Sequence, residues 1–183
     1  MITCKINGKE VSVGENTTIL EAASQNGIAI PTLCYKKGVN EIGSCRLCMV
    51  QVQGFDHLLA ACKTEVQEGF DIQTESEKLT SYRREMLKLL LANHKLDCMN
   101  CPENGNCRLQ FLCNKYGVTK SEYPGSRTKL SEAFPLLDAN PYISYDPSKC
   151  IHCQSCISAC NRLAANHSLR SGRSGVFHLV EAP

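Results

Sequence analysis

Cysteine is the residue type with the clearest capacity for chemistry in this sequence, with 13 of them among 183 residues. All but two fall into three groups, and the middle group begins with a histidine in the run H-x3-C-x2-C-x5-C. The members of the groups are Cys34, Cys45, Cys48 and Cys62; His94, Cys98, Cys101 and Cys107; and Cys150, Cys153, Cys156 and Cys160. Thiolates and imidazoles at such short intervals are typical ligands of a metal ion or an iron–sulfur cluster.

A disulfide framework is the main alternative for so many cysteines. The N-terminal segment MITCKINGKE lacks the basic and then apolar layout of a secretion signal, and no apolar run is long enough to cross a bilayer. Cytosolic thiols stay reduced. We therefore expect metal centres in a cytoplasmic protein that is not inserted in a membrane, although a complex can hold it at the cytoplasmic membrane. The net charge of +2 gives no indication of a nucleic-acid-binding surface.

The first group has the spacing C-x10-C-x2-C-x13-C, and residues 28–48 read as a long irregular loop. Four thiolates on such a loop bind either Zn²⁺ or a [2Fe–2S] cluster. The first gap is longer than in typical zinc sites, and it also departs from the plant-type C-x4-C-x2-C pattern. The ligand chemistry favours iron–sulfur and leaves zinc open. Arg46, between two of the cysteines, either offsets their negative charge or is a solvated surface side chain.

The second group supplies four ligands in one piece, and a [4Fe–4S] cube requires four, one for each iron. Because an imidazole replaces one thiolate, the reduction potential of this site should exceed that of an all-cysteine site. The third group, C-x2-C-x2-C-x3-C, is the run of bacterial ferredoxins, with Asn161 where a proline normally follows.

In two-cluster ferredoxins the fourth cysteine of this run binds the other cluster, and here no cysteine follows Cys160. Two hypotheses remain open. The chain is either truncated or frameshifted after Cys160, or it is a small subunit in which all four cysteines bind one [4Fe–4S] cluster.

The elements that position these ligands follow from local patterns. Asn7-Gly8 predicts a hairpin between two alternating strands, and a capping box of Thr18 and Glu21 predicts a helix that ends at Asn26-Gly27. Further strands are expected near residues 49–52, 58–62 and 70–73. These elements predict a small mixed sheet wrapped on a helix, with Cys4 as a buried thiol of the core.

Residues 76–94 predict a long amphipathic helix that ends at His94. Its apolar face is expected to carry Leu79, Tyr82, Met86 and Leu90, with Arg83, Arg84 and Lys88 mainly elsewhere. A short helix with Leu109 and Leu112 on its apolar face should follow, and we expect Cys113 to pack there. His152 and His167 read as ordinary surface histidines.

The four-cysteine site followed by H-x3-C-x2-C-x5-C resembles the N-terminal module of the large iron–sulfur subunit of NADH dehydrogenase (respiratory complex I). It is also similar to [FeFe]-hydrogenase large subunits and NAD-dependent formate dehydrogenase alpha subunits. The resemblance covers residues 1–118. It implies an α+β chain with a β-grasp [2Fe–2S] ferredoxin domain over residues 1–78 and a helical His/Cys3 [4Fe–4S] domain over residues 79–118. A linker over residues 119–140 and an incomplete ferredoxin-type [4Fe–4S] segment over residues 141–183 would follow.

No dinucleotide fingerprint, P-loop or nucleophile motif is visible, so we expect a non-catalytic electron-transfer subunit, or a fragment, of an NAD(H)-linked oxidoreductase. By the resemblance, electrons enter from a flavin-containing NAD(H)-oxidising subunit. They leave towards a hydrogenase, a formate dehydrogenase or a quinone-reducing partner of the complex I type. A free-standing ferredoxin-like carrier and a zinc-binding interaction module are the alternatives. A redox-sensing regulator should also carry a DNA-binding or kinase element, and the sequence shows neither.

Overall fold

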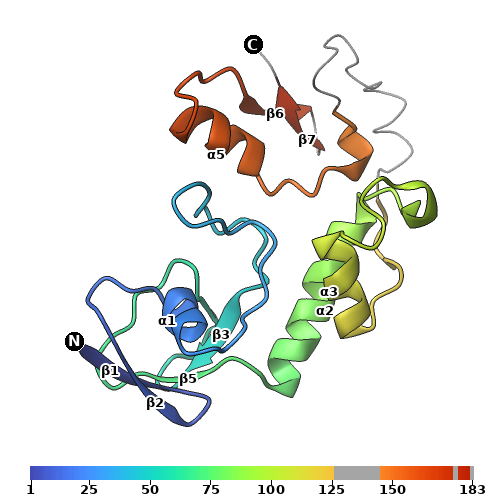
Figure 1. Cartoon of the computed structure of the whole chain (residues 1–183). Helices are drawn as coiled ribbons and strands as arrows, with labels where there is room; N and C mark the ends of the chain where they lie inside the picture. The colour runs from blue at the N-terminus through green and yellow to red at the C-terminus, as the bar shows by residue number, and fades with distance from the viewer. Residues whose placement is uncertain (126–144, 175–176, 182–183) are drawn as a thin grey trace. The chain divides into compact units, whose positions relative to one another are not determined.

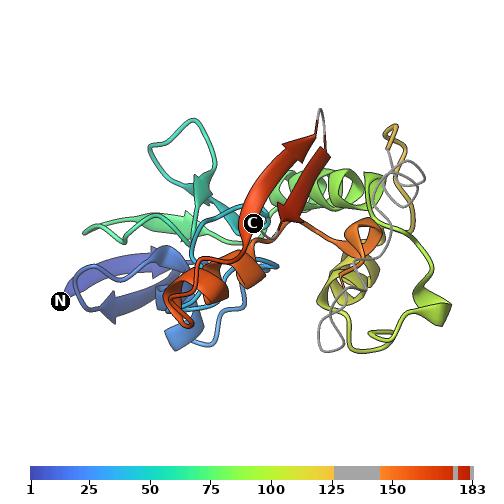
Figure 2. The ribbon, with the colours of Figure 1, turned by 90° about the horizontal axis from the view of Figure 1, so that it is seen from above.

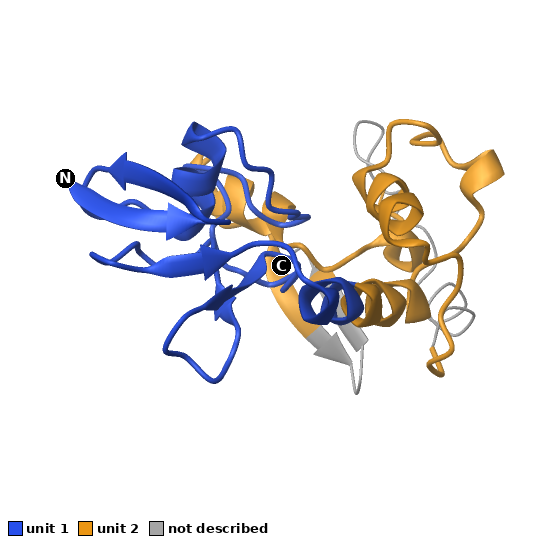
Figure 3. Ribbon diagram, turned by 90° about the horizontal axis from the view of Figure 1, so that it is seen from below, with its two compact units in different colours: residues 1–83 blue, residues 84–183 orange. Residues whose placement is uncertain are grey.

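The structure is a computed structural model, and it describes residues 1–125, 145–174 and 177–181. The chain divides into two compact units, Met1–Arg83 and Arg84–Pro183, with the boundary inside one long helix (Figure 3). Within the described ranges, no helix has both the length and the apolar character that spanning a bilayer requires.

The first unit is built on a five-stranded mixed sheet in the order β2-β1-β5-β3-β4. Its strands are β1 (Ile2–Ile6), β2 (Lys9–Val13), β3 (Met49–Val52), β4 (Leu59–Ala60) and β5 (Asp71–Gln73). β1 pairs in parallel with β5, and the other neighbours are antiparallel. The predicted hairpin at Asn7-Gly8 is confirmed, because both residues have positive φ, as a two-residue turn of this kind requires.

Helix α1 (Ile19–Gln25) lies across the sheet (Figure 1) and supplies four buried residues to the core. The predicted capping box is present: the Glu21 N–H donates to Thr18 Oγ1 over 3.2 Å, and the Thr18 N–H donates back to the Glu21 carboxylate over 3.3 Å. Cys4 is 2% exposed within the same core, as expected for a structural thiol. The α+β class is therefore confirmed.

Helix α2 (Glu77–Ala92) corrects one expectation about the predicted amphipathic helix. Its buried row is Leu79, Arg83, Leu87 and Leu91, whereas Tyr82, Met86 and Leu90 are half-buried. The predicted face was displaced because the sequence pattern treated Arg83 as a solvent-facing charge, and its guanidinium is instead hydrogen-bonded inside the first unit. The helix also ends at Ala92, two residues before His94.

The second unit continues with the short helices η1 (Cys98–Asn100), α3 (Arg108–Tyr116), η2 (Pro147–Lys149) and α5 (Ser155–Arg162). Helix α3 confirms the predicted short helix, with Leu109, Leu112 and Cys113 buried. The expected linker lies mostly outside the described residues, and its first part, residues 119–125, forms no helix or strand.

A two-stranded antiparallel ribbon follows the third cysteine group (Figure 2). It consists of β6 (Arg170–Ser174) and β7 (Phe177–Glu181), with five paired positions. The sequence pattern did not predict this hairpin, since the Ser/Gly/Arg-rich stretch shows neither apolar alternation nor a strong turn signal.

Candidate iron–sulfur centres

The four cysteines of the first group come together inside the first unit, and all four side chains are buried. The Sγ atoms of Cys34 and Cys45 lie 3.4 Å apart, and those of Cys48 and Cys62 lie 3.3 Å apart. Three of these residues belong to the loop between α1 and β3 and its junction with β3, and Cys62 follows β4. The fold thus brings the thiol of Cys62, which is distant in sequence, to three cysteines that belong to a single loop.

The pairing of these sulfurs bears on the two ligand readings of the sequence. A zinc ion needs all four sulfurs at about 2.3 Å from one point, whereas two irons divide four thiolates between them. The two close contacts, Cys34 with Cys45 and Cys48 with Cys62, agree with a [2Fe–2S] cluster in which each iron takes two thiolates.

Hydrogen bonding inside each pair makes one sulfur more acidic than the other. The bond with Cys45 lowers the pKa of Cys34 to about 5, and the bond with Cys62 lowers the pKa of Cys48 to about 7. The same bonds, together with burial, raise the pKa of Cys45 and of Cys62. Because ligands bind iron as thiolates, each pair already contains one sulfur that readily takes that form at neutral pH.

The ligand loop is held by contacts that the sequence pattern did not reveal. Asn40 is fully buried, and its Nδ2 donates to the Cys34 carbonyl over 2.7 Å. The Leu33 N–H donates to Cys45 Sγ over 3.4 Å, an interaction that stabilises a thiolate. Gly43 has φ of +74°, a left-handed conformation that favours glycine, and a Cβ there would lie 3.1 Å from Cγ of the Lys63 side chain.

Arg46 lies between two of the cysteines in the sequence. Its side chain is exposed, and its backbone has a φ of +54°. This position favours the solvated alternative of the two that its sequence location left open. A buried cation does approach the loop, but it is Arg83 from helix α2.

The second group also comes together, around one cavity in the second unit. His94, Cys98, Cys101 and Cys107 all line it. Cys98 begins η1, Cys101 follows it, and Cys107 is the N-cap of α3. In a [4Fe–4S] cube each ligand binds a different iron, so the four ligand atoms do not need to meet at one point. The donor set and its arrangement fit such a cube.

Cys113 lies beside this second group. It is 7% exposed, and together with His94, Cys98 and Cys107 it lines a neighbouring cavity of about 200 Å³. Burial, followed by the negative charges of Cys107 and Cys98, raises its pKa to about 11, so it remains a neutral thiol at neutral pH. Cys113 is thus buried, as expected for a packing residue, and it also lies next to the candidate ligands.

The third group lies around the two short helices η2 and α5. Cys150 follows η2, Cys153 lies between the helices, and Cys156 and Cys160 belong to α5. Burial raises the pKa of Cys156, and the charges of Cys150 and Cys153 add to this rise. Cys160 Sγ lies 3.4 Å from Ser168 Oγ, in the segment before β6, and this contact lowers the pKa of Cys160.

His152 departs from the expectation of an ordinary surface histidine. It is half-buried, its N–H donates to Cys150 Sγ over 3.4 Å, and its Nδ1 lies 3.9 Å from the same sulfur. Burial lowers its pKa. The one-dimensional pattern missed this contact because it depends on a left-handed backbone at His152, with φ of 53°. His167 is exposed, as expected.

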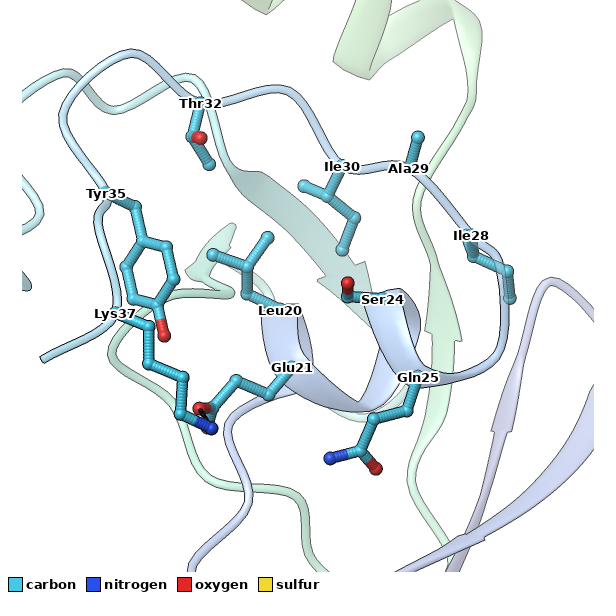
Figure 4. Close-up of a pocket in the computed structure, with 10 residues that line it drawn as sticks. All are labelled: Leu20, Glu21, Ser24, Gln25, Ile28, Ala29, Ile30, Thr32, Tyr35 and Lys37. Atoms are coloured by element: carbon cyan, nitrogen blue, oxygen red, sulfur yellow. Dashed lines mark ion pairs between the residues drawn. The ribbon is translucent and has the colours of Figure 1, made fainter.

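A further cavity of about 410 Å³ lies between α1 and the segment that leads into Cys34 (Figure 4). Glu21 and Lys37 form an ion pair of 2.6 Å at this cavity, and Tyr35 lies beside them. Burial, followed by the charges of Glu21 and Glu41, raises the pKa of Tyr35 to about 12. No nucleophile with an adjacent base lines it, so nothing at this cavity indicates substrate chemistry.

The fold and the cysteine-rich sites together define an iron–sulfur protein of the α+β class. Residues 1–77 match the 2Fe-2S iron-sulfur cluster binding domain, and residues 83–122 match the NADH-ubiquinone oxidoreductase-G iron-sulfur binding region. Both expected types of cofactor, [2Fe–2S] and [4Fe–4S], are therefore confirmed.

Three relatives extend the similarity over the whole chain. The NADPH-Fe(3+) oxidoreductase subunit alpha of Geobacter sulfurreducens is 37% identical over 99% of this chain, which covers 21% of that protein. The NADP-reducing hydrogenase subunit HndD of Solidesulfovibrio fructosivorans is 37% identical over 100% of this chain, which covers 31% of that subunit. A chain in the crystal structure of an NAD+-reducing [NiFe]-hydrogenase in the H2-reduced state matches with a TM-score of 0.86 and 31% identity, over 99% of this chain and 74% of that one.

This chain belongs to the family of iron–sulfur modules found in NADH-quinone oxidoreductases and in hydrogenase subunits such as HndD. The family resemblance expected from the sequence is confirmed. The chain spans between about a fifth and a third of the length of these curated relatives.

Proposed function

We propose that this chain relays single electrons through three iron–sulfur centres. The observation that carries the proposal is the arrangement of four buried thiols as two close pairs, Cys34 with Cys45 and Cys48 with Cys62. Such pairs fit two irons that each take two thiolates. Iron–sulfur clusters supply one-electron chemistry without a substrate site, which agrees with a chain whose described cavities lack an arranged catalytic set.

The ligand sets and domains follow the same reasoning. We assign Cys34, Cys45, Cys48 and Cys62 to a [2Fe–2S] cluster in a β-grasp domain over residues 1–78, supported by a mixed sheet crossed by one helix. We assign His94, Cys98, Cys101 and Cys107 to a [4Fe–4S] cluster in a helical domain over residues 79–118, supported by the cavity that all four line.

A third centre is assigned to the segment over residues 141–183. The charges of Cys150 and Cys153 act on Cys156 there, whereas Cys160 contacts Ser168. We therefore propose the first three cysteines as its ligands from this chain. Three thiolates leave one position of a cube for another ligand.

The residues of the chain contribute positioning and burial to the relay. Burial of the first four sulfurs keeps water from the irons, and the Leu33 N–H fixes a ligand sulfur by a hydrogen bond. Rigid surroundings of this kind allow electron gain and loss with little rearrangement. His94 in place of a thiolate raises the potential of the second centre relative to an all-cysteine site.

The partners are proposed from the relatives. The relatives include a subunit of an NADP-reducing hydrogenase and a chain of an NAD+-reducing [NiFe]-hydrogenase. We propose that a flavin-containing, NAD(H)-oxidising subunit donates electrons to this chain in the cytoplasm. The acceptor is a hydrogenase, a formate dehydrogenase or a complex I-type partner.

Stopped-flow oxidation tests the relay directly. The protein, prepared without air and reduced with dithionite, is freed of excess reductant and mixed with oxidised cytochrome c. We expect rapid cytochrome reduction with a stoichiometry equal to the number of reducible clusters per chain. The same chain stripped of iron by a chelator is the control. Equal cytochrome reduction by both forms would contradict the proposal.

A further inference from the structure

Arg83 is a buried cation near the end of the second turn of helix α2, with only 1% of its surface exposed. It ranks among the largest fully buried side chains of the described chain. Burying a guanidinium is costly unless its N–H groups are hydrogen-bonded. Its position inside the first unit therefore requires a specific set of acceptors.

The acceptors of Arg83 include three backbone carbonyls from two separate segments. Nε donates to the Leu47 carbonyl over 3.2 Å, and one terminal nitrogen donates to the Met49 carbonyl over 3.1 Å and to the Thr74 carbonyl over 2.9 Å. Leu47 and Met49 are the residues on either side of Cys48. A single side chain thus holds the backbone both before and after a candidate ligand.

The third acceptor ties this arrangement to the sheet. Thr74 directly follows β5 and is 1% exposed. Its N–H donates to Asn7 Oδ1 over 2.8 Å, and its hydroxyl oxygen accepts from Asn7 Nδ2 over 2.7 Å. The planar guanidinium therefore connects the ligand loop to a rigid part of the β1–β2 hairpin, which a flexible point charge such as lysine would do less well.

The charge of the sulfur site also affects Tyr82, which lies on the same turn of α2. Burial raises the pKa of Tyr82, the neighbouring residue, and Arg46 opposes this rise, while negative charge at Cys48 and Cys45 adds to it. A fixed positive charge held at the carbonyls on either side of Cys48 favours the more negative, reduced form of a site. Hydrogen bonding of Arg83 to the Leu47 carbonyl also polarises the peptide group that contains the Cys48 N–H.

We propose that Arg83 is a positioning residue of the [2Fe–2S] centre. Its guanidinium clamps the backbone around Cys48, and its charge raises the reduction potential of the site. The inference rests on the proposed assignment of Cys34, Cys45, Cys48 and Cys62 as ligands. It adds a determinant of potential that lies outside the ligand motif, on a helix that follows the sheet.

The test is a redox titration of the full chain, loaded without air and monitored by the EPR signal of the [2Fe–2S] cluster. Three variants are compared with the unaltered chain. Arg83→Met removes the charge and the hydrogen bonds at similar volume, and Arg83→Lys keeps the charge but cannot span three carbonyls. Arg84→Met is the matched control, because Arg84 is exposed and its Nε donates to the Tyr116 carbonyl over 2.9 Å in the second unit.

At the midpoint potential of the [2Fe–2S] cluster in the unaltered chain, we expect Arg83→Met to show a reduced-to-oxidised ratio about tenfold lower. This corresponds to a fall of about 59 mV in the reduction potential for one electron. Arg84→Met and Arg83→Lys should stay within about threefold of the unaltered ratio. In Arg83→Lys a chelator should remove iron from the [2Fe–2S] site about tenfold faster, because the clamp is lost.

Two results would overturn the proposal. One is a loaded Arg83→Met whose ratio stays within about threefold of that of the unaltered chain. The other is an Arg83→Lys that loses iron no faster than the unaltered chain, and this result decides the matter even if Arg83→Met does not fold. An unaltered chain without any [2Fe–2S] signal would instead contradict the ligand assignment itself.

Discussion

The sulfur atoms of Cys48 and Cys62 lie 3.3 Å apart, although Cys48 lies at the end of the ligand loop and Cys62 follows the next hairpin of the sheet. The pairing of β3 with β4 produces this proximity, because Met49 lies opposite Ala60 in the register. The geometry of the sheet therefore determines which thiol completes the second pair.

Cys62→Ala should abolish the [2Fe–2S] cluster, because an iron that loses one of two thiolates has no replacement in this pair. The measurement is the EPR spectrum of the reduced protein together with its iron content. Cys4→Ala is the matched control, since Cys4 is equally buried but belongs to the core. It should keep the cluster and lose only about 1 kcal/mol of folding free energy. Loss of the cluster in both variants would count against the assignment of Cys62 as a ligand, because a general folding defect would then explain the loss.

His94 offers a test of the second centre. His94→Cys should keep a [4Fe–4S] cluster but lower its potential, because a thiolate adds negative charge that the imidazole lacks. A redox titration with EPR detection measures the shift. His57→Cys is the control, since His57 is exposed and lies in the first unit. If His94→Ala retained both the spectrum and the potential of the unaltered chain, the imidazole would not be a ligand.

The contact of Cys160 with Ser168 gives a prediction for the third centre. Cys156→Ala should lose the iron of that centre, whereas Cys160→Ala should retain it, since Cys160 Sγ contacts Ser168 Oγ. Iron quantification of each purified variant is the measurement. Equal loss of iron from both variants would support the original grouping of all four cysteines around one cluster.

Glu21 links stability to pH through its carboxylate, which bonds Lys37 and the capping residue Thr18. Its hydrogen bond with Lys37 and its bonds with Thr18 lower its pKa below the usual 4.5. A lowered folded-state pKa contributes stability that is present above pH 4.5 and is lost as the pH falls through the folded value. Glu21→Gln should therefore cost about 0.5 kcal/mol at pH 7 and flatten the acid side of the stability curve.

Urea denaturation at a series of pH values measures this dependence. Glu15→Gln is the control, because Glu15 is an exposed residue before the helix. A stability curve for Glu21→Gln that remained parallel to that of the unaltered chain between pH 7 and pH 3 would contradict the role of the Glu21 charge.

Short-range signals in the sequence predicted much of this fold. Asn7-Gly8 specified the first hairpin, and the pair Thr18 and Glu21 specified the start of α1, because both depend on contacts within a few residues. The ligand groups were also visible, since cysteines at such short regular spacing are typical of metal and cluster sites.

Contacts between distant segments could not be predicted in the same way. Periodicity placed Arg83 with the solvent-facing charges, because nothing near it in sequence shows that carbonyls of Leu47, Met49 and Thr74 will surround it. The tertiary structure overrides the helical pattern there. The contact of Cys160 with Ser168 likewise depends on a turn that the spacing of the cysteines does not encode.

EPR spectroscopy of the dithionite-reduced full chain, with iron and sulfide quantified in the same sample, tests the central claim most directly. We predict a brown protein with distinct [2Fe–2S] and [4Fe–4S] signals and about ten iron atoms per chain when all three centres are filled. A colourless protein that contains zinc and gives no cluster signal after anaerobic preparation would contradict the account.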